Sequence, residues 1–197
     1  DRMLIRLFEY VRRTAEYVLF MRTEDGDPVI TLFTDSDFAG ERSTRKSTSG
    51  WTYGFLFPNG TFAPLDWGST AQKCVCLSTA EAELRAAVDG GREFLGAFGL
   101  LELVSGSEPE GATVQIDSQA CLDVIRKGRS EKMRYASGAN PRKAVHVNMR
   151  WAHEVLGPYA VKVDTTVNVA DIFTKALDKT TFERHRERLG VMPFDNI

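Results

Sequence analysis

The chain has 197 residues, of which 43% are hydrophobic and 26% are charged, and its formal net charge is −2. These proportions are ordinary for a globular protein, and the length suits one domain with a helical appendage. The sequence shows no apolar run long enough to cross a membrane and no signal peptide, so membrane and secreted classes are not expected. It begins with Asp1 instead of Met, as a piece of a longer protein would.

The first half of the chain predicts one helix and then a series of strands. Leu4, Leu7 and Val11 recur at helical spacing and predict a helix over residues 3–21. The predicted strands cover residues 29–34, 51–57, 61–67 and 73–77. The hairpin signal Pro-Asn-Gly joins the second strand to the third, so we expect an antiparallel meander.

A long helix is predicted to follow, from Ser78 to about Val104. Ser78 and Glu81 have the spacing of a capping box, in which each side chain satisfies a backbone N–H of the other residue. The middle of this helix reads Asp-Gly-Gly-Arg-Glu. Because each glycine costs a helix interior about 1 kcal/mol, we expect close packing against this position.

The second half of the chain alternates strands with helices. The predicted elements are a strand at 112–117, a helix capped by Ser118 that ends near 126, a helix opening near 141, a strand at 159–164, a helix capped by Asn168 and a final helix from about 180 to 189. The predicted class is therefore α/β, with a mixed central sheet (antiparallel meander plus parallel strands) flanked by helices, preceded by an N-terminal helix.

The cysteines and histidines do not form a zinc motif. Three cysteines (Cys74, Cys76 and Cys121) and three histidines are scattered along the sequence. A structural zinc site needs about four ligands at compact spacing, so buried reduced thiols are the better interpretation.

Positive charge is concentrated in one segment. From Arg126 to Arg150 there are eight basic residues against Glu131 alone, a balance of +7 in a chain whose total is −2. Such a block can hold phosphate groups. The alternative is a solvated surface, which the charge pattern alone does not exclude.

Four carboxylates lie at the ends of predicted elements. Asp35 and Asp117 each end a strand, and Glu83 and Asp171 each lie in the first turns of a helix. Two strand ends and two helix starts can meet at one edge of a sheet. Acids gathered there would repel each other at low dielectric, and such a cluster persists chiefly by holding divalent cations. Carboxylate oxygens suit Mg²⁺.

Each acid also has a local interpretation. Asp35 could form a turn, Glu83 could complement the helix dipole, and Asp117 could cap the helix that follows it. Asp171 could form a capping pair with Asn168. One residue at a time, these interpretations remain open.

Four segments in order carry a family resemblance. They are TDSDFAGERSTRKSTSGWTYGF, WGSTAQKCVCLSTAEAEL, IDSQACL and NVADIFTKAL, and FERHRERLGV is similar to the closing helix. Over residues 1–191 the chain resembles the ribonuclease H domain of the Pol polyprotein of copia-type LTR retrotransposons. The resemblance implies a ribonuclease H-like fold at 27–191, an N-terminal helix at 1–26 that ends the preceding reverse transcriptase, and a tail at 192–197.

The resemblance implies that Asp35, Glu83, Asp117 and Asp171 are the catalytic and metal-binding residues. Asp37 and Glu81 are the rival choices. The family pattern favours the first aspartate of the strand end, and the glutamate that directly precedes an apolar helix residue, as Glu83 precedes Leu84. Glu81 would then be the cap.

The resemblance further implies an endonuclease that cuts the RNA strand of RNA–DNA hybrids with two Mg²⁺ (or Mn²⁺) ions. The reverse transcriptase of the same polyprotein would be a partner, no membrane would be involved, and the setting would be intracellular, in cytoplasm, virus-like particles or nucleus. Candidates for sugar contacts are Ser36, Ser118 and Gln119. Candidates for phosphate contacts are Lys73, Arg126, Lys127, Arg129, Lys132, Arg134, Arg142 and Lys143.

Two departures from the family pattern keep other functions open. The loop at 164–168 has no histidine, and Asn148 stands where the family often has an acid. The main alternative is a catalytically inactive or host-adopted module that binds hybrids without cutting them. A transposase of the same fold class and a purely structural role are further alternatives.

Overall fold

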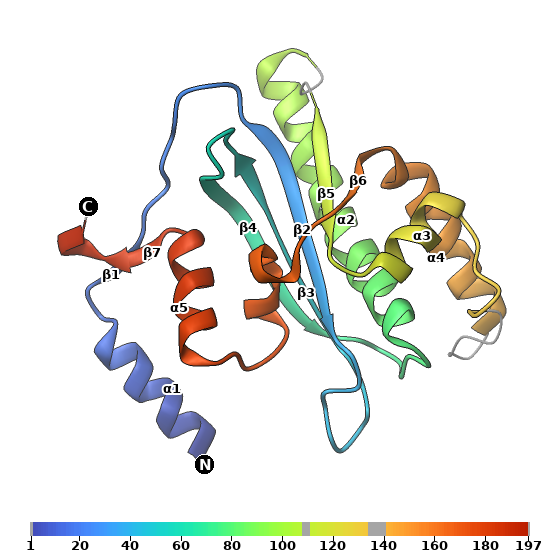
Figure 1. The fold of residues 1–197 in the computed structure, drawn as a ribbon, viewed down its shortest axis with the longest axis horizontal. Coiled ribbons are helices and arrows are strands. Elements are labelled where there is room, and N and C mark those ends of the chain that lie inside the picture. Colours follow the sequence, from blue (N-terminus) through green and yellow to red (C-terminus); the bar gives the residue numbers. More distant parts are fainter. Residues whose placement is uncertain (1, 108–110, 134–140, 197) are drawn as a thin grey trace.

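The computed structural model describes residues 2–107, 111–133 and 141–196 and centres on a five-stranded sheet (Figure 1). The strands are β2 (Val29–Asp37), β3 (Thr48–Leu56), β4 (Phe62–Ala71), β5 (Ala112–Ile116) and β6 (Ala160–Lys162), in the order β4-β3-β2-β5-β6. The first three strands pair antiparallel, and β5 and β6 are parallel to β2. The predicted mixed sheet is therefore confirmed.

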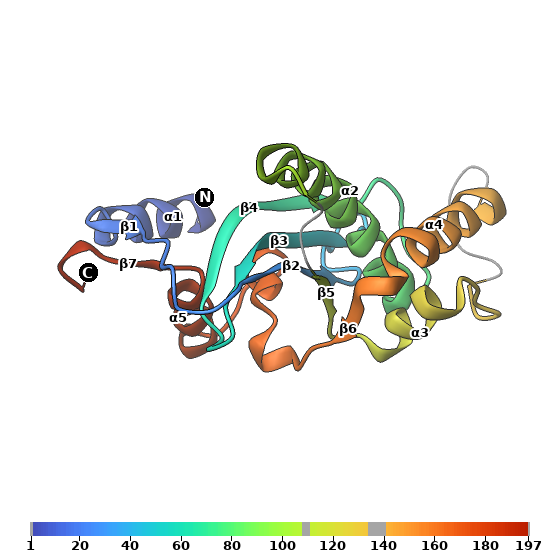
Figure 2. The same ribbon diagram turned by 90° about the horizontal axis from the view of Figure 1, so that it is seen from above.

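Helices cover both faces of this sheet (Figure 2). On one face, α2 (Thr79–Ser105), α3 (Gln119–Lys127) and α4 (Pro141–Val155) enclose the larger core with residues such as Leu32 and Val114. On the other face, the 3-10 helix η3 (Val169–Phe173) and α5 (Lys179–Arg188) enclose a smaller core around Phe33. Short 3-10 helices η1 (Gly157–Tyr159), η2 (Thr165–Val167) and η4 (Phe194–Asn196) complete the described helices.

The close packing expected at the two glycines of the long helix is confirmed. A Cβ on Gly90 would lie 2.7 Å from the Cβ of Trp51, and one on Gly91 would lie 2.9 Å from Leu156. The glycines thus let α2 approach β3 on one side and α4 on the other. This contact fixes the height of α2 above the sheet, and with it the position of the residues at its start.

The N-terminal helix is shorter than predicted. Helix α1 spans Arg2–Arg13, and the following β1 (Tyr17–Leu19) pairs antiparallel with β7 (Val191–Pro193). Residues 17–19 are apolar and aromatic, so they suit a helix as well as a strand. They form a strand because they pair with residues near the other end of the sequence. Figures 1 and 2 place α1 near α5, at the end of the molecule away from α3 and α4.

Two further sequence predictions were wrong. Residues 73–77 do not form a strand, because Gln72 turns inward to donate to the Ala82 carbonyl and accept from Cys76, so the segment wraps around the start of α2. Instead β4 runs to Ala71. The element after Asn168 is the 3-10 helix η3 and not an α-helix. In the described part of the chain, no helix has both the length and the apolar content to cross a membrane.

Candidate active site

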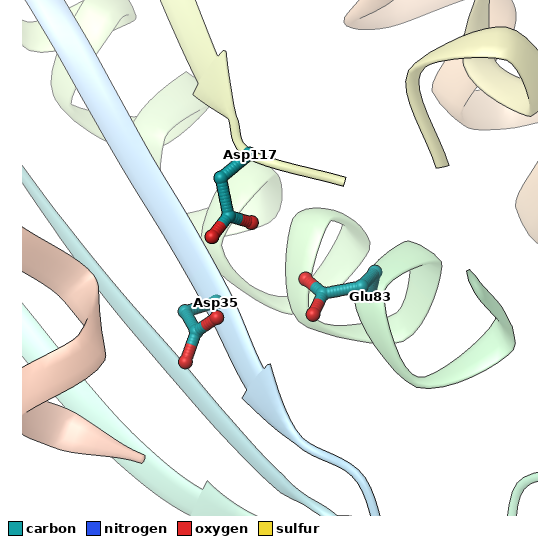
Figure 3. A group of neighbouring side chains, drawn as sticks. All are labelled: Asp35, Glu83 and Asp117. Carbon is teal, nitrogen blue, oxygen red and sulfur yellow. The ribbon is translucent and has the colours of Figure 1, made fainter. Parts of the chain in front are cut away.

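Three carboxylates converge at one edge of the sheet, as Figure 3 shows. Strands β2 and β5 are parallel neighbours with Thr34 opposite Ile116, so the next residues, Asp35 and Asp117, emerge side by side. Glu83 reaches the same place from the first turns of α2. One oxygen from each of these side chains lies within 4.8 Å of the others. The edge predicted from sequence therefore does gather these acids.

The capping of α2 separates Glu81 from this cluster. Ser78 accepts a hydrogen bond from the Glu81 N–H, and Glu81 Oε2 accepts one from the Leu77 N–H at 3.0 Å. The other oxygen of Glu81 pairs with Arg85 at 2.8 Å. Glu81 is thus held at the start of α2, where its side chain accepts from the N–H of Leu77 and not, as the predicted capping box has it, from that of Ser78. Glu83 is the glutamate that faces the aspartates. The other rival, Asp37, is packed beside Gly40 at the end of β2.

The fourth predicted acid, Asp171, is delivered by η3. Asn168 caps η3 and donates from Nδ2 to the carbonyl of Thr34 at 3.0 Å, directly before Asp35 in the sequence. Gly50, which is opposite Asp35 in β3, leaves room for η3, since a Cβ there would lie 2.4 Å from Thr174 Cγ2. These contacts hold Asp171 beside Asp35 although the two residues are far apart in sequence.

Asp171 is linked to the cluster through a lysine and a threonine. Lys175 Nζ lies 2.9 Å from Asp171 Oδ1 and 3.6 Å from Asp35 Oδ2. The Thr174 hydroxyl donates to the same Oδ2 of Asp35. Asp171 is buried, but the group of oxygens within 4.8 Å of one another comprises only Asp35, Glu83 and Asp117 among the described residues. The structure therefore gives three closely spaced acids with the fourth next to them.

The crowding of buried acids raises their pKa values. Burial, and then the charges of Asp35 and Asp117, raise the pKa of Glu83 to about 9. Burial and the charge of Asp35 raise the pKa of Asp171 to about 6. The same two causes raise the pKa of Asp117, against a weaker opposing hydrogen bond from Thr165. Without a cation, this site therefore resists holding all its negative charge.

The donor set fits a hard divalent cation. Glu83 is only 4% exposed, and its Oε2 is buried without a hydrogen-bond partner among the described residues. A buried carboxylate oxygen without a partner is costly, and a cation would remove that cost. Asp35, Glu83 and Asp117 each offer a carboxylate oxygen, the ligand type that Mg²⁺ and Mn²⁺ prefer.

The predicted sugar contacts have different surroundings. Ser36 is buried next to Glu83, on the α2 side of β2. Ser118 is partly buried and caps α3, its hydroxyl oxygen accepting from the Cys121 N–H. Gln119 is exposed and donates to Asp123. Of these three residues, Gln119 is therefore the most accessible from solvent.

The predicted phosphate contacts fall into separate groups. Lys127, Arg129 and Lys132 line a cavity of about 760 Å³ together with the start of α2. Arg126 donates to the Ala160 carbonyl. Lys73 lines a different cavity, of about 410 Å³, together with Asn148 and without any of the four acids. Arg134, Arg142 and Lys143 lie outside the residues whose side chains are described.

Sequence reasoning did not single out Gly50, Thr174 or Lys175. A signal existed for Lys175, which is four residues after Asp171 and so falls on the same side of a helical turn. No sequence signal connects Gly50 or Thr174 with Asp35, because their contacts depend on how η3 packs across β3.

Comparison with known proteins places this architecture in a family. No family model matches the chain. Over 168 residues, or 84% of the chain, it is 33% identical to the "Retrovirus-related Pol polyprotein from transposon TNT 1-94" of Nicotiana tabacum. The match spans only 12% of that polyprotein.

Several solved structures are also similar. LC11-RNase H1 in complex with RNA/DNA hybrid matches with a TM-score of 0.46 and 16% identity, over 77% of this chain and 98% of that one. RNase H1 from Halobacterium salinarum NRC-1 matches with a TM-score of 0.42 and 14% identity, over 74% and 93%. Prototype Foamy Virus Protease-Reverse Transcriptase matches with a TM-score of 0.44 and 9% identity, over 85% and 21%.

The strand order, the mixed pairing and the acids at the ends of β2 and β5 define a ribonuclease H-like fold. The predicted resemblance is confirmed by the sequence match to the tobacco polyprotein. The chain belongs to the retrovirus-related Pol polyproteins of transposons and corresponds to one ribonuclease H-like domain of such a polyprotein.

Proposed function

We propose that this chain is a metal-dependent endonuclease that hydrolyses the RNA strand of RNA–DNA hybrids during reverse transcription of a retrotransposon. The observation that carries the proposal is the convergence of Asp35, Glu83 and Asp117 within 4.8 Å, with Asp171 held beside them. The active setting would be intracellular, wherever reverse transcription of the element takes place.

The proposed roles follow from the contacts of each residue. Asp35, Glu83, Asp117 and Asp171 would hold two Mg²⁺ or Mn²⁺ ions, with Thr174 orienting Asp35 through its hydroxyl. When bound, such ions lower the pKa of a water and neutralise charge on a phosphodiester. Hydrolysis would leave 5′-phosphate and 3′-hydroxyl ends. Glu83 must lose its proton for this role, so we expect ion binding to strengthen with rising pH.

A hybrid would be recognised by its shape and its 2′-hydroxyls, which only one of its strands carries. Gln119, two residues after Asp117 in the sequence, is exposed and is the proposed sugar contact, although its Nε2 donates to Asp123 in this structure. Lys127, Arg129 and Lys132 line a cavity beside the start of α2, where positive side chains and the positive end of the helix dipole favour phosphate.

The decisive test is cleavage of a labelled RNA–DNA hybrid with Mg²⁺ or Mn²⁺, beside single-stranded RNA and both homoduplexes. We expect hybrid-specific cutting that falls at least about a thousandfold in Asp117→Asn, because the ions lose a ligand. Asp27→Asn is the matched control, since Asp27 is an exposed acid that precedes β2 and lies outside the cluster. Hybrid binding without cutting in the wild type, also when the reverse transcriptase is attached, would favour the non-cutting module instead.

The phosphate contacts have an independent test in the salt dependence of hybrid binding. Neutralising Lys127 and Lys132 together should weaken binding and reduce the slope of log K against log salt by about 0.7–0.9 for each lysine that touches a phosphate. Lys179→Met is the control, because Lys179 is exposed on α5 outside this cavity. An unchanged slope in the double variant would remove these lysines from the proposed interface.

The reverse transcriptase of the same polyprotein is the proposed protein partner. No residue of α1 is buried, and its apolar side chains remain largely exposed, including Met3 at 80% and Leu4 at 52%. A stripe of this kind is costly in water and marks an interaction surface. The matched polyprotein extends far beyond the matched region, so it offers a segment that could cover α1.

A further inference from the structure

Lys175 brings a positive charge into the group of acids. Its amino group lies 2.9 Å from Asp171 Oδ1 and 3.6 Å from Asp35 Oδ2. The two carboxylates are almost completely buried, whereas the Lys175 side chain remains 36% exposed. The lysine therefore reaches the acids from the solvent side and retains a route back to solvent.

The neighbouring acids stabilise the protonated, positively charged form of Lys175. Burial alone would lower the pKa of Lys175, but Asp35, Asp171 and Asp117 together raise it above its usual value. In the described part of the chain, both salt bridges that reach the four acids come from Lys175. Lys162 is also near, but its amino group donates to the carbonyls of Asp117 and Val163. Lys175 thus neutralises one side of the site.

The two sides of the site consequently differ. Asp35, Glu83 and Asp117 share a space, and Glu83 Oε2 in it has no hydrogen-bond partner among the described residues. Between Asp35 and Asp171 the ammonium of Lys175 already supplies the positive charge. A divalent ion placed near these same oxygens would be repelled by the ammonium unless the flexible side chain moved away.

We propose that Lys175 is a built-in counter-ion that competes with a divalent cation for the Asp35–Asp171 pair. The inference rests on the proposed function, because it presupposes a metal site at the four acids. A first ion then binds among Asp35, Glu83 and Asp117 with Lys175 in place. A second ion between Asp35 and Asp171 binds more weakly, because it must displace the amino group of Lys175 toward solvent.

Calorimetric titration of the full chain with Mn²⁺ tests this competition without using activity. The informative variant is Lys175→Met, which removes the charge, keeps a similar length and adds no oxygen ligand. We expect the weaker Mn²⁺ site to become about tenfold tighter, the effect of removing one repelling charge from a partly exposed position. Lys175→Arg keeps the charge and should leave the weaker site weak. Lys179→Met controls for the loss of a lysine elsewhere, since Lys179 is 87% exposed and pairs only with Glu183 in the described chain.

A melting experiment gives a second readout. In chelator, Lys175→Met should melt at a lower temperature than the wild type, because Asp35 and Asp171 lose their counter-ion. Saturating Mn²⁺ should restore more of its stability than it adds to the wild type. Lys179→Met should show neither change.

The outcomes separate this inference from the proposed function. If the wild type binds Mn²⁺, Asp117→Asn does not, and Lys175→Met binds it no more tightly than the wild type, the competition is overturned and the metal site stands. Weaker binding by Lys175→Met would also overturn it, and would make Lys175 a residue that positions the acids. If the wild type binds no Mn²⁺ at all, the proposed metal-dependent function fails, and the competition fails with it.

Discussion

The carboxylate cluster and helix α1 differ in burial. The cluster has negative charge that is not fully compensated, and α1 has apolar surface that is not covered. At the cluster, β2, β5, α2 and η3 bury acids such as Glu83 and Asp171 in a site that their own charges make unfavourable. At α1, no residue is buried, and the contact with the domain includes an edge-on packing of Tyr10 against Phe182. One region holds too much charge for its burial, and the other exposes too much apolar surface.

The difference shows two ways in which a chain can indicate what it binds. Buried acids without enough positive charge favour a cation, because a cation offsets their mutual repulsion while they stay ionised. An exposed apolar stripe favours a protein surface, because burying it removes apolar area from water. The cluster should therefore respond to metal and pH, whereas α1 should respond to a protein partner and contribute little to folding.

The largest expected effect is on the pH dependence of stability through Glu83. The pKa of Glu83 is about 9 in the folded protein against 4.5 for an ordinary glutamate. Between these values the native state keeps a proton that the unfolded chain has lost, so the metal-free protein loses stability as pH rises. Each pKa unit corresponds to about 1.4 kcal/mol, so this loss reaches up to about 6 kcal/mol.

Urea unfolding in chelator at pH 5 and pH 9 measures that loss. Glu83→Gln cannot ionise, so its free energy of unfolding should change much less between the two pH values than that of the wild type. Glu93→Gln, an exposed residue of the same helix, should behave as the wild type does. If the free energy of unfolding depends on pH equally in the wild type and in Glu83→Gln, then burial and the neighbouring acids do not raise the pKa of Glu83.

The next largest effect is expected at Gly50, where the cluster depends on close packing. An added Cβ would meet Thr174 Cγ2 at 2.4 Å and the Ala170 carbonyl oxygen at 3.0 Å. Gly50→Ala should therefore cost about 1–3 kcal/mol of stability and move Asp171 away from Asp35, with loss of hybrid cleavage. Unfolding and cleavage assays on the same preparation check both effects.

A matched glycine in α2 serves as the control for that substitution. Gly99 has no atom within 4 Å of an added Cβ, so Gly99→Ala should be neutral or stabilise the helix by up to about 1 kcal/mol. Similar losses of stability in the two variants would mean that Gly50 does not position η3.

The smallest effect on folding is expected in α1. Replacing Leu4 and Phe8 by Gln should change the free energy of unfolding by less than about 0.5 kcal/mol, because both side chains are more than half exposed. The fully buried Leu122 provides the contrast, since Leu122→Ala should cost about 2–5 kcal/mol. The same α1 variant should lose binding to the reverse transcriptase segment of its polyprotein, measured by calorimetry. A folding loss above about 1 kcal/mol would instead make α1 part of the folded core.

Much of the framework was predictable because its signals are local. Ser78, Ser118 and Asn168 were recognised as caps, and each accepts the expected backbone hydrogen bond. The paired glycines in α2 indicated a close approach, which is now seen against Trp51 and Leu156. The predictions that failed include a strand at 73–77 and a helix through residue 21. Packing contacts decided both, since Gln72 and Cys76 fold the first segment against the start of α2 and residues 17–19 pair with a strand near the end of the sequence.

The sequence by itself determined which acids end the strands and begin the helices, since an apolar run followed by Asp35 or Asp117 can be read without any contact. Tertiary structure decided how close the acids come: it brings Glu83, which the family resemblance already favoured, to these aspartates and leaves Glu81 with Arg85. It also decided that Lys175 lies between Asp35 and Asp171. The reason is physical: burial and charge pairing depend on the packing of η3 and α2 against the sheet, and short stretches of sequence do not encode that packing.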